Sequence, residues 1–196
     1  MEKKFELTEK YVVNELGTKL YQIKCTKTFE YAKKGELGGY IEREVNLSQE
    51  GNAWVFGDAQ VSGDARVSGN AWVSGDAQVS GNARVFGNAW VSGDAQVSGY
   101  ARVSGDAQVS GNACLKSDAD HCGFDCFGSS NRHTHAYLTS DNTVEITCGY
   151  FRGSIEEFEK KVKNTHAGTV YENQYNAIIN VIKIKFGSAQ RQNRQV

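Results

Sequence analysis

Residues 72–102 read WVSGDAQVSGNARVFGNAWVSGDAQVSGYAR, and this stretch decides the fold. Every sixth residue lies between an alanine and a valine, and these residues run Trp, Gln, Arg, Trp, Gln, Arg. The same pattern extends over residues 51–116 as eleven hexads of the form G-[DN]-A-x-V-[SF], with Tyr100 in one Asn/Asp position and Leu115 and Lys116 ending the last hexad. A fixed short period is typical of a solenoid, and a period of six predicts a parallel β-helix.

Each position of the hexad has a physical role. Alternation along a short strand places Ala and Val on one side and the variable residue and Ser/Phe on the other. The Gly-Asn/Asp pair supplies a turn, because glycine readily adopts positive φ and Asn or Asp tolerates it. Three such bends close a triangle, so we expect three hexads, or 18 residues, to form one coil.

The Trp, Gln, Arg cycle of the variable residue then follows from the three faces of the coil, because each face receives every third hexad. Residues 18 positions apart become neighbours on adjacent strands ~4.8 Å apart. The expected stacked sets are Trp54, Trp72 and Trp90; Gln60, Gln78 and Gln96; and Arg66, Arg84 and Arg102. As an alternative, duplication of an 18-residue unit would produce the same Trp/Gln/Arg cycle without any selection for the stacked side chains.

The flanking segments predict two end pieces. Residues 1–36 contain strand-like runs and are expected to form a small N-terminal β cap, with the β-helix over residues 37–122. Residues 123–186 predict a hairpin with a turn at Ser-Asp-Asn and two helices, the first opened by a capping box of Ser154 and Glu157 and stopped by Gly168. Residues 187–196 predict a frayed tail.

The hexads resemble the left-handed parallel β-helix of hexapeptide-repeat proteins, and the expected handedness comes from that resemblance. The segments ELGGYIEREVNLSQEGNAWV, FGSSNRHTHAYL and CGYFRGSIEEFEKKVKNTH also resemble a family of such proteins common in tailed phages and prophages. The resemblance implies a phage origin and an accessory role. This chain has Tyr150 where members usually have a second cysteine, and members usually lack its paired histidines.

Composition narrows the classes of function. The formal net charge of −1 argues against general binding to nucleic acid or anionic membranes. No run approaches the ~20 apolar residues of a bilayer span, and the start MEKKFELTEK lacks the apolar region of a signal peptide. We therefore expect a location in the host cytoplasm, with the five cysteines as reduced thiols.

The tryptophan ladder is the first candidate site. Trp54, Phe56, Trp72 and Trp90 would share one outer face and could contact a partner protein, a base or a sugar. The alternative is that the C-terminal helices or a second subunit cover them, since exposed apolar surface is usually buried. A homodimer or a homotrimer would fit this face.

The arginine ladder and the aspartates Asp58, Asp76 and Asp94 have simpler interpretations. The arginines could bind phosphates, but a solvated face offset by nearby Asp64 is the favoured interpretation. The aspartates could bind cations, but Asp is common in turns.

The segment HCGFDCFGSSNRHTHAY contains the remaining candidates. Cys122, Cys126, His133 and His135 are zinc ligand types, although C-x3-C followed by H-x-H is a weak spacing, and we expect no metal or cofactor. A Cys148–His166 catalytic pair is conceivable, but a buried thiol is the favoured interpretation. Hydroxyl and backbone donors together with arginines suit a phosphate. The expected ligand site consists of Ser129, Ser130, Asn131, Arg132, His133, His135 and Arg152.

Three functions follow. The favoured hypothesis is a non-enzymatic phage protein that counters host defence by sequestering a nucleotide immune signal. The second is an inhibitor or structural protein that binds a host or virion protein. The third, a hexapeptide-type acyltransferase, is disfavoured because the hexads contain no histidine to act as a base.

Overall fold

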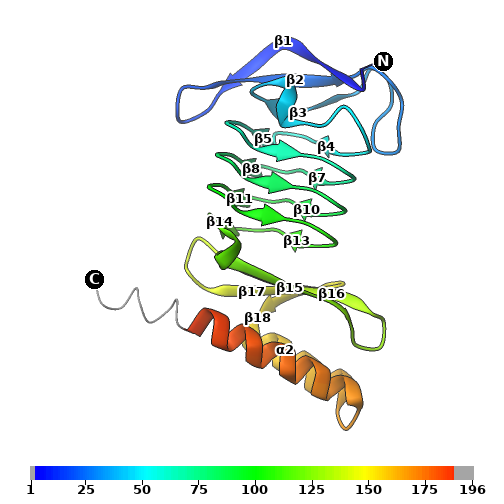
Figure 1. Cartoon of the computed structure of the whole chain (residues 1–196), viewed down its shortest axis with the longest axis vertical. Coiled ribbons are helices and arrows are strands. Elements are labelled where there is room, and N and C mark those ends of the chain that lie inside the picture. Colours follow the sequence, from blue (N-terminus) through cyan, green and yellow to red (C-terminus); the bar gives the residue numbers. More distant parts are fainter. Residues whose placement is uncertain (1–2, 188–196) are drawn as a thin grey trace, which may run out of the picture. The chain divides into compact units, whose positions relative to one another are not determined.

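The computed structural model describes residues 3–187, and its central element is a β-solenoid (Figure 1). Each hexad contributes one strand of two residues. The strands are β4 Trp54–Val55, β5 Gln60–Val61, β6 Arg66–Val67, β7 Trp72–Val73, β8 Gln78–Val79, β9 Arg84–Val85, β10 Trp90–Val91, β11 Gln96–Val97, β12 Arg102–Val103, β13 Gln108–Val109 and β14 Cys114–Leu115. The fold class is therefore the one that the period predicts.

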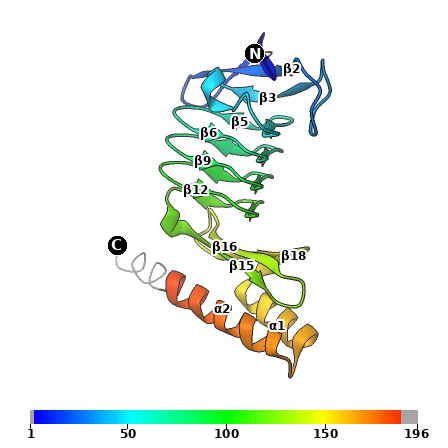
Figure 2. The ribbon, with the colours of Figure 1, turned by 45° about the vertical axis from the view of Figure 1, so that its right-hand side comes forward.

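The strands stack in three parallel ladders, one on each face. The ladders run β4-β7-β10-β13, β5-β8-β11-β14 and β6-β9-β12, and Figure 2 shows the last of these from the side. Trp54 pairs with Trp72 and Trp72 with Trp90, while Gln60 pairs with Gln78. Residues 18 apart are thus direct neighbours, as predicted.

The interior of the coil contains the alanines and valines of the hexads, which are almost completely buried. The glycines make the corners. Gly75 has a φ of 69°, and a Cβ there would lie 2.9 Å from the backbone nitrogen of Gly93 in the next coil. Glycine is therefore required both for the left-handed backbone conformation and for the close stacking of corners.

The N-terminal strands continue one face of the solenoid. They are β1 Phe5–Val13, β2 Lys19–Cys25 and β3 Leu37–Ile41. β1, β2 and β3 pair antiparallel, and β3 then pairs parallel with β5, so one sheet runs β1-β2-β3-β5-β8-β11-β14. The β cap predicted for residues 1–36 thus extends to β3, whose edge would otherwise be unpaired.

The two ends of the solenoid present opposite backbone groups. Along the coil, the N–H groups of the variable residue and of the Ser/Phe residue donate to carbonyls in the next coil, as from Trp54 to Ala71 and from Phe56 to Val73. The first coil is therefore left mainly with free carbonyls and the last coil mainly with free N–H groups. Because buried backbone groups without partners are costly, the two ends require different side chains.

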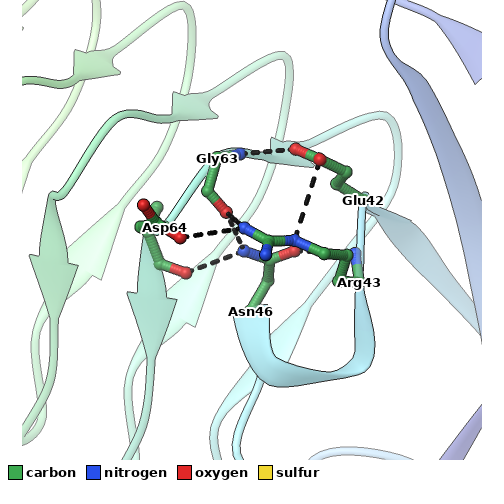
Figure 3. Close-up of polar contacts among 6 residues, drawn as sticks. Glu42, Arg43, Asn46, Gly63 and Asp64 are labelled. Carbon is green, nitrogen blue, oxygen red and sulfur yellow. Dashed lines mark hydrogen bonds and ion pairs between the residues drawn. The ribbon is translucent and has the colours of Figure 1, made fainter.

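Donors satisfy the carbonyls at the N-terminal end. The short 3₁₀ helix η1, Glu44–Asn46, places the buried Asn46 amide 3.0 Å from the Gly63 carbonyl and 2.9 Å from the Ala65 carbonyl (Figure 3). The Asn46 side-chain oxygen accepts from the backbone N–H of Arg43 at 2.7 Å. The Arg43 guanidinium also donates to the Gly63 carbonyl.

A buried lysine completes this end. Lys4 Nζ donates to the carbonyl of Ala53 at 2.9 Å and approaches that of Gly51 at 3.3 Å. Lys4 is 5% exposed, and burial lowers the pKa of its side chain to about 8. The ammonium group therefore occupies the place of a missing strand.

Acceptors satisfy the N–H groups at the C-terminal end. The 3₁₀ helix η2, Asp118–Asp120, places the Asp118 carboxylate 2.8 Å from the backbone nitrogen of Arg102. The Asp120 carboxylate accepts from the backbone N–H groups of Lys116 and Ser117, both at 2.8 Å. Carboxylates are suited to this end because they only accept hydrogen bonds.

Residues from His121 onward form a second compact unit. Its antiparallel sheet runs β15 His121–Phe127, β16 Arg132–Leu138, β17 Val144–Cys148 and β18 Phe151–Ser154. The predicted hairpin forms from β16 and β17, with Asn142 at a φ of 56° in its turn. The predicted boundary after residue 122 is two residues late, because His121 and Cys122 pair with β16.

Two helices cover one face of this sheet. They are α1 Ile155–His166 and α2 Val170–Gly187, so Gly187 belongs to α2, and the rest of the predicted tail lies outside the described residues. The Ser154–Glu157 capping box is present, and Gly168 follows α1 with a φ of 73°. Within residues 3–187, no helix has the length and apolar character needed to span a membrane.

The core of the second unit lies between the helices and the sheet. It contains Ile146 and Phe158 together with Tyr175, Ile178, Ile179, Ile182 and Phe186 of α2. Tyr171 of α2 is only partly buried, and its ring lies edge-on to that of His166, with centroids 5.9 Å apart.

Candidate functional site

The sheet of the second unit separates the predicted ligand residues into two groups. Alternation along β16 places Arg132, Thr134 and Ala136 on the helix side and His133 and His135 on the opposite side. The contacts agree, because Ala136 belongs to the core beneath the helices, whereas the rings of His133 and His135 lie 5.7 Å apart. The seven residues therefore do not form one site.

The histidine side of the sheet is a hydrogen-bonded cluster. His121 Nδ1 and His135 Nε2 are 2.9 Å apart, and His133 Nδ1 lies 2.5 Å from Asp125 Oδ1. Cys122 packs instead against the helix-side core, where burial raises its pKa to about 11. The weak candidate set for zinc is thus divided, and residues 3–187 contain no group of three or more His, Cys, Asp or Glu side chains placed to hold a metal ion.

Arg152 is occupied by an ion pair. Its Nε lies 2.5 Å from Glu145 Oε1 and its Nη2 3.2 Å from Glu145 Oε2, and the Tyr137 hydroxyl donates to the same carboxylate. This hydrogen bonding raises the pKa of Arg152. The prediction that Arg132 and Arg152 bind one phosphate together is wrong, since the two arginines lie on opposite faces of the sheet.

The helix side of the sheet contains a pocket, which we call the helix-side pocket. Its volume is about 90 Å³. It is lined by Arg132, Cys148, Phe151, Phe158, Lys161, Val162, Thr165, His166 and Tyr175. A water molecule takes ~30 Å³ in the liquid, so the pocket suits one phosphate-sized or carboxylate-sized group.

Two glycines allow the backbone to approach this pocket closely. A Cβ on Gly149, with φ of 59°, would lie 2.8 Å from Arg132 Nη1. A Cβ on Gly128, with φ of 74°, would lie 2.1 Å from the Tyr175 hydroxyl. A side chain at either position would crowd Arg132 or Tyr175, so the glycines leave room for these two side chains beside the pocket.

The charges of the pocket favour an anion. Arg132, Lys161 and His166 supply basic groups, and no carboxylate is part of the lining. Burial raises the pKa of Tyr175 to about 12, so its phenol is protonated at neutral pH and can donate. The rings of His166 and Tyr175 stack with centroids 5.4 Å apart.

Cys148 lies in this lining but is poorly placed as a nucleophile. It is 6% exposed, accepts a hydrogen bond from Thr134 Oγ1 at 3.3 Å, and has the Tyr175 hydroxyl 3.8 Å away. The ring of His166 stacks on that of Tyr175. The buried-thiol interpretation therefore fits the geometry better than a Cys148–His166 pair.

The loop before Arg132 lies beside the helix-side pocket. Ser129, Ser130 and Asn131 are exposed in the turn between β15 and β16, directly after Gly128. Sequence reasoning found this loop and Arg132 but not Lys161, which lies one position before the buried Val162. The signal available was the spacing of Phe158, Lys161 and Thr165, which is helical.

The tryptophan face has a different cover from the one predicted. Trp54 is buried under Phe5 and Phe29 of the N-terminal segment, with ring centroids 6.2 and 5.4 Å away. Trp72 lies between Phe56, stacked at 3.8 Å, and Tyr31 at 5.4 Å. Only Trp90, 49% exposed, is open, so Trp54 cannot belong to an oligomer face.

The polar corners are ladders of turn residues. Asn52 donates to Asn70 at 3.3 Å, Asn70 to Asn88 at 3.1 Å, and Asn88 to Asp106 at 2.9 Å. Asp58, Asp76 and Asp94 are exposed in equivalent turns. These residues support the turn role that the hexad predicts.

Comparison with known proteins places the similarity in the solenoid. A model of the YdcK beta solenoid repeat matches residues 59–75, 77–93 and 95–111. The protein named "Uncharacterized acetyltransferase YdcK" from Escherichia coli (strain K12) is 37% identical over 81 residues. That alignment covers 34% of this chain and 25% of the relative's length. The chain is therefore a β-solenoid repeat protein.

Proposed function

We propose that the protein is a non-enzymatic ligand-binding protein whose helix-side pocket holds an anionic group of a small ligand. The observation that carries this proposal is the convergence of Arg132, Lys161 and His166 on a small pocket with no carboxylate in its lining. Arginine binds phosphate through a planar fork and lysine as a point charge. Neither Arg132 nor Lys161 has an ion pair with another described residue.

The shape of the pocket limits what it can hold. About 90 Å³ accommodates one anionic group, so the rest of a nucleotide would lie outside, against the Ser129–Asn131 loop. The hydroxyl and backbone donors of that loop suit a sugar or a second phosphate. The resemblance to phage sequences supplies the proposed task, which is to sequester a nucleotide immune signal in the host cytoplasm.

Binding of nucleotides to the full chain tests the proposal. Thermal shift and calorimetry would use cyclic dinucleotides and ADP-ribose-type nucleotides with the variants Arg132→Gln and Lys161→Gln. We expect each to weaken binding about 10-fold, since a hydrogen bond to a charged group contributes roughly 1.5–3 kcal/mol. Lys160→Gln is the matched control, because Lys160 is exposed, precedes Lys161 directly and does not line the pocket.

Two results would count against this function. One is the absence of a thermal shift or of retained nucleotide across the panel. The other is equal affinity in Arg132→Gln, Lys161→Gln and Lys160→Gln, which would move the ligand away from the pocket.

Acyl transfer is the second candidate, favoured by the name of the Escherichia coli relative. In this chain, His166 is the histidine that lines the helix-side pocket and could act as a general base. Consumption of acetyl-CoA that depends on His166, measured with His166→Ala, would favour this candidate over simple binding. A host or virion protein retained by the exposed Trp90 would favour the remaining alternative, an inhibitor or structural role.

A further inference from the structure

The arginine face of the solenoid contains a second cavity, which we call the arginine groove. Its volume is about 450 Å³, within the range of ~300–1,000 Å³ typical of small-molecule sites. It is lined by Val45, Ser48, Arg66, Val67, Ser68, Arg84 and Phe86. All of these residues belong to the first compact unit, so the groove is independent of the helix-side pocket.

Strand register places the two arginines of the groove side by side. The strands β6 and β9 are neighbours in the ladder (Figure 2). Arg66 on β6 pairs with Arg84 on β9, and paired strands are ~4.8 Å apart. Leu47 continues the ladder by pairing with Val67, which brings Ser48 and η1 to the N-terminal rim. The groove is therefore built by the regular stack plus one non-repetitive turn.

The two arginines lack the counter-ions that their neighbours have. Arg102, the third member of the ladder, pairs with Asp118 at 3.0 Å. Asp64, two residues before Arg66, pairs instead with Arg43 at 3.0 Å. Within residues 3–187, Arg66 and Arg84 have no ion pair, and no carboxylate lines the groove. An anion bound between them would relieve the repulsion of two stacked like charges.

Phe86 adds an apolar surface where the other coils of this face have serine. The corresponding positions on this face are Ser48, Ser68 and Ser104. The other phenylalanine of the hexads, Phe56, stacks on Trp72 with ring centroids 3.8 Å apart. Phe86, by contrast, is 39% exposed and has no aromatic partner among the described residues. Val45, 61% exposed, lies on the same groove.

We propose that the arginine groove binds a small aromatic anion, in which a phosphate or carboxylate lies beside a planar ring. Arg66 and Arg84 hold the anionic group, since guanidinium groups match the geometry of both anions. The ring lies against Phe86 and Val45, and the Ser68 hydroxyl is available to donate beside it. This site goes beyond the proposed function, which concerns the second unit.

Calorimetric titration of the full chain tests the groove. The probes are ADP, salicylate, inorganic pyrophosphate and adenosine, which separate the phosphate, carboxylate, anion and ring contributions. We expect ADP or salicylate to bind, with the Kd raised about 10-fold by Arg84→Gln and about 5-fold by Phe86→Ser. Phe86→Ser restores the residue of the repeat, so the solenoid should fold unchanged. Pyrophosphate binding should be insensitive to Phe86→Ser.

Matched variants assign the outcome. Arg102→Gln removes an arginine of the same ladder that is already paired and lies outside the groove lining, so its Kd should equal that of the wild type. The proposal is overturned if neither ADP nor salicylate binds, or if Arg84→Gln and Phe86→Ser bind them as the wild type does. Loss of both ADP and salicylate binding in Arg132→Gln alone would assign these ligands to the helix-side pocket and also overturn the groove.

Discussion

The two ends of the solenoid use opposite chemistry for the same task. At the N-terminal end, the amide of Asn46 and the ammonium of Lys4 donate to free carbonyls. At the C-terminal end, the carboxylates of Asp118 and Asp120 accept from free N–H groups. The difference teaches that a solenoid has a direction: because the N–H groups of the variable and Ser/Phe residues, such as Trp72 and Ser74, donate toward the next coil, each end is closed mainly by one kind of group.

The ends also differ in exposure. Asn46 is completely buried, and Lys4 is 5% exposed, whereas Asp118 is exposed and Asp120 half-buried. Water can replace a lost side chain at the exposed end but not at the buried end. Loss of a capping side chain should therefore cost more at the N-terminal end.

Removal of Asn46 should have the largest effect. Asn46→Ala deletes three hydrogen bonds and leaves the carbonyls of Gly63 and Ala65 without these donors, which should lower the free energy of unfolding by about 3 kcal/mol. Urea denaturation followed by tryptophan fluorescence measures the loss. Asn82→Ala, at an exposed hexad corner, is the control and should change stability by less than about 0.5 kcal/mol. Equal losses in both variants would refute the capping role.

Removal of Asp120 should have a smaller effect. Asp120→Ala exposes the backbone N–H groups of Lys116 and Ser117 to water, and we expect a loss of about 1–2 kcal/mol in the same assay. Asp94→Ala, at an exposed turn, is the matched control. A loss as large as that of Asn46→Ala would show that exposure does not distinguish the two ends.

The smallest effect is a pH dependence at Lys4. Burial lowers the pKa of Lys4 from 10.5 to about 8, so between these values the unfolded chain binds more protons than the folded one. The contribution of Lys4 to stability should therefore rise as the pH rises through this window. The full shift corresponds to about 2 kcal/mol between pH 7.5 and pH 9.5, and solvent screening reduces the expected rise to about 1 kcal/mol. Comparing the wild type with Lys4→Met at pH 7.5 and pH 9.5 by urea denaturation isolates it. The comparison belongs in a Cys25→Ala background, because Cys25 interacts with Lys4. The prediction would be contradicted if the stability of the wild type relative to Lys4→Met stayed constant or fell as the pH rises.

The hexads made the solenoid predictable in detail. Their period alone identified Trp54, Trp72 and Trp90 as neighbours, and the helix capping box at Ser154 was equally readable. Periodicity worked because each residue depends on positions a fixed distance away. The cover of Trp54 was not predictable, because Phe5 and Phe29 belong to a segment with no repeat.

The candidate sites were predicted only in part. The sequence indicates Arg132 and the Ser-rich loop. The face of the sheet that Arg152 occupies depends on the pairing of β17 with β18, which local sequence does not specify. The arginine groove could not be predicted without the ion pair between Asp64 and Arg43, which are 21 residues apart in the sequence. Such pairings depend on how η1 turns over the first coil, which local sequence does not specify.

The sequence by itself determined the period, the three faces, the inward Ala and Val positions and the glycine corners, because these follow from local backbone geometry repeated along the chain. Tertiary structure alone decided which charges stay unpaired, which aromatic rings are covered and which face of the second sheet each side chain occupies. Those outcomes depend on contacts between segments that share no pattern, and competition among alternative partners settles them only when the chain has folded.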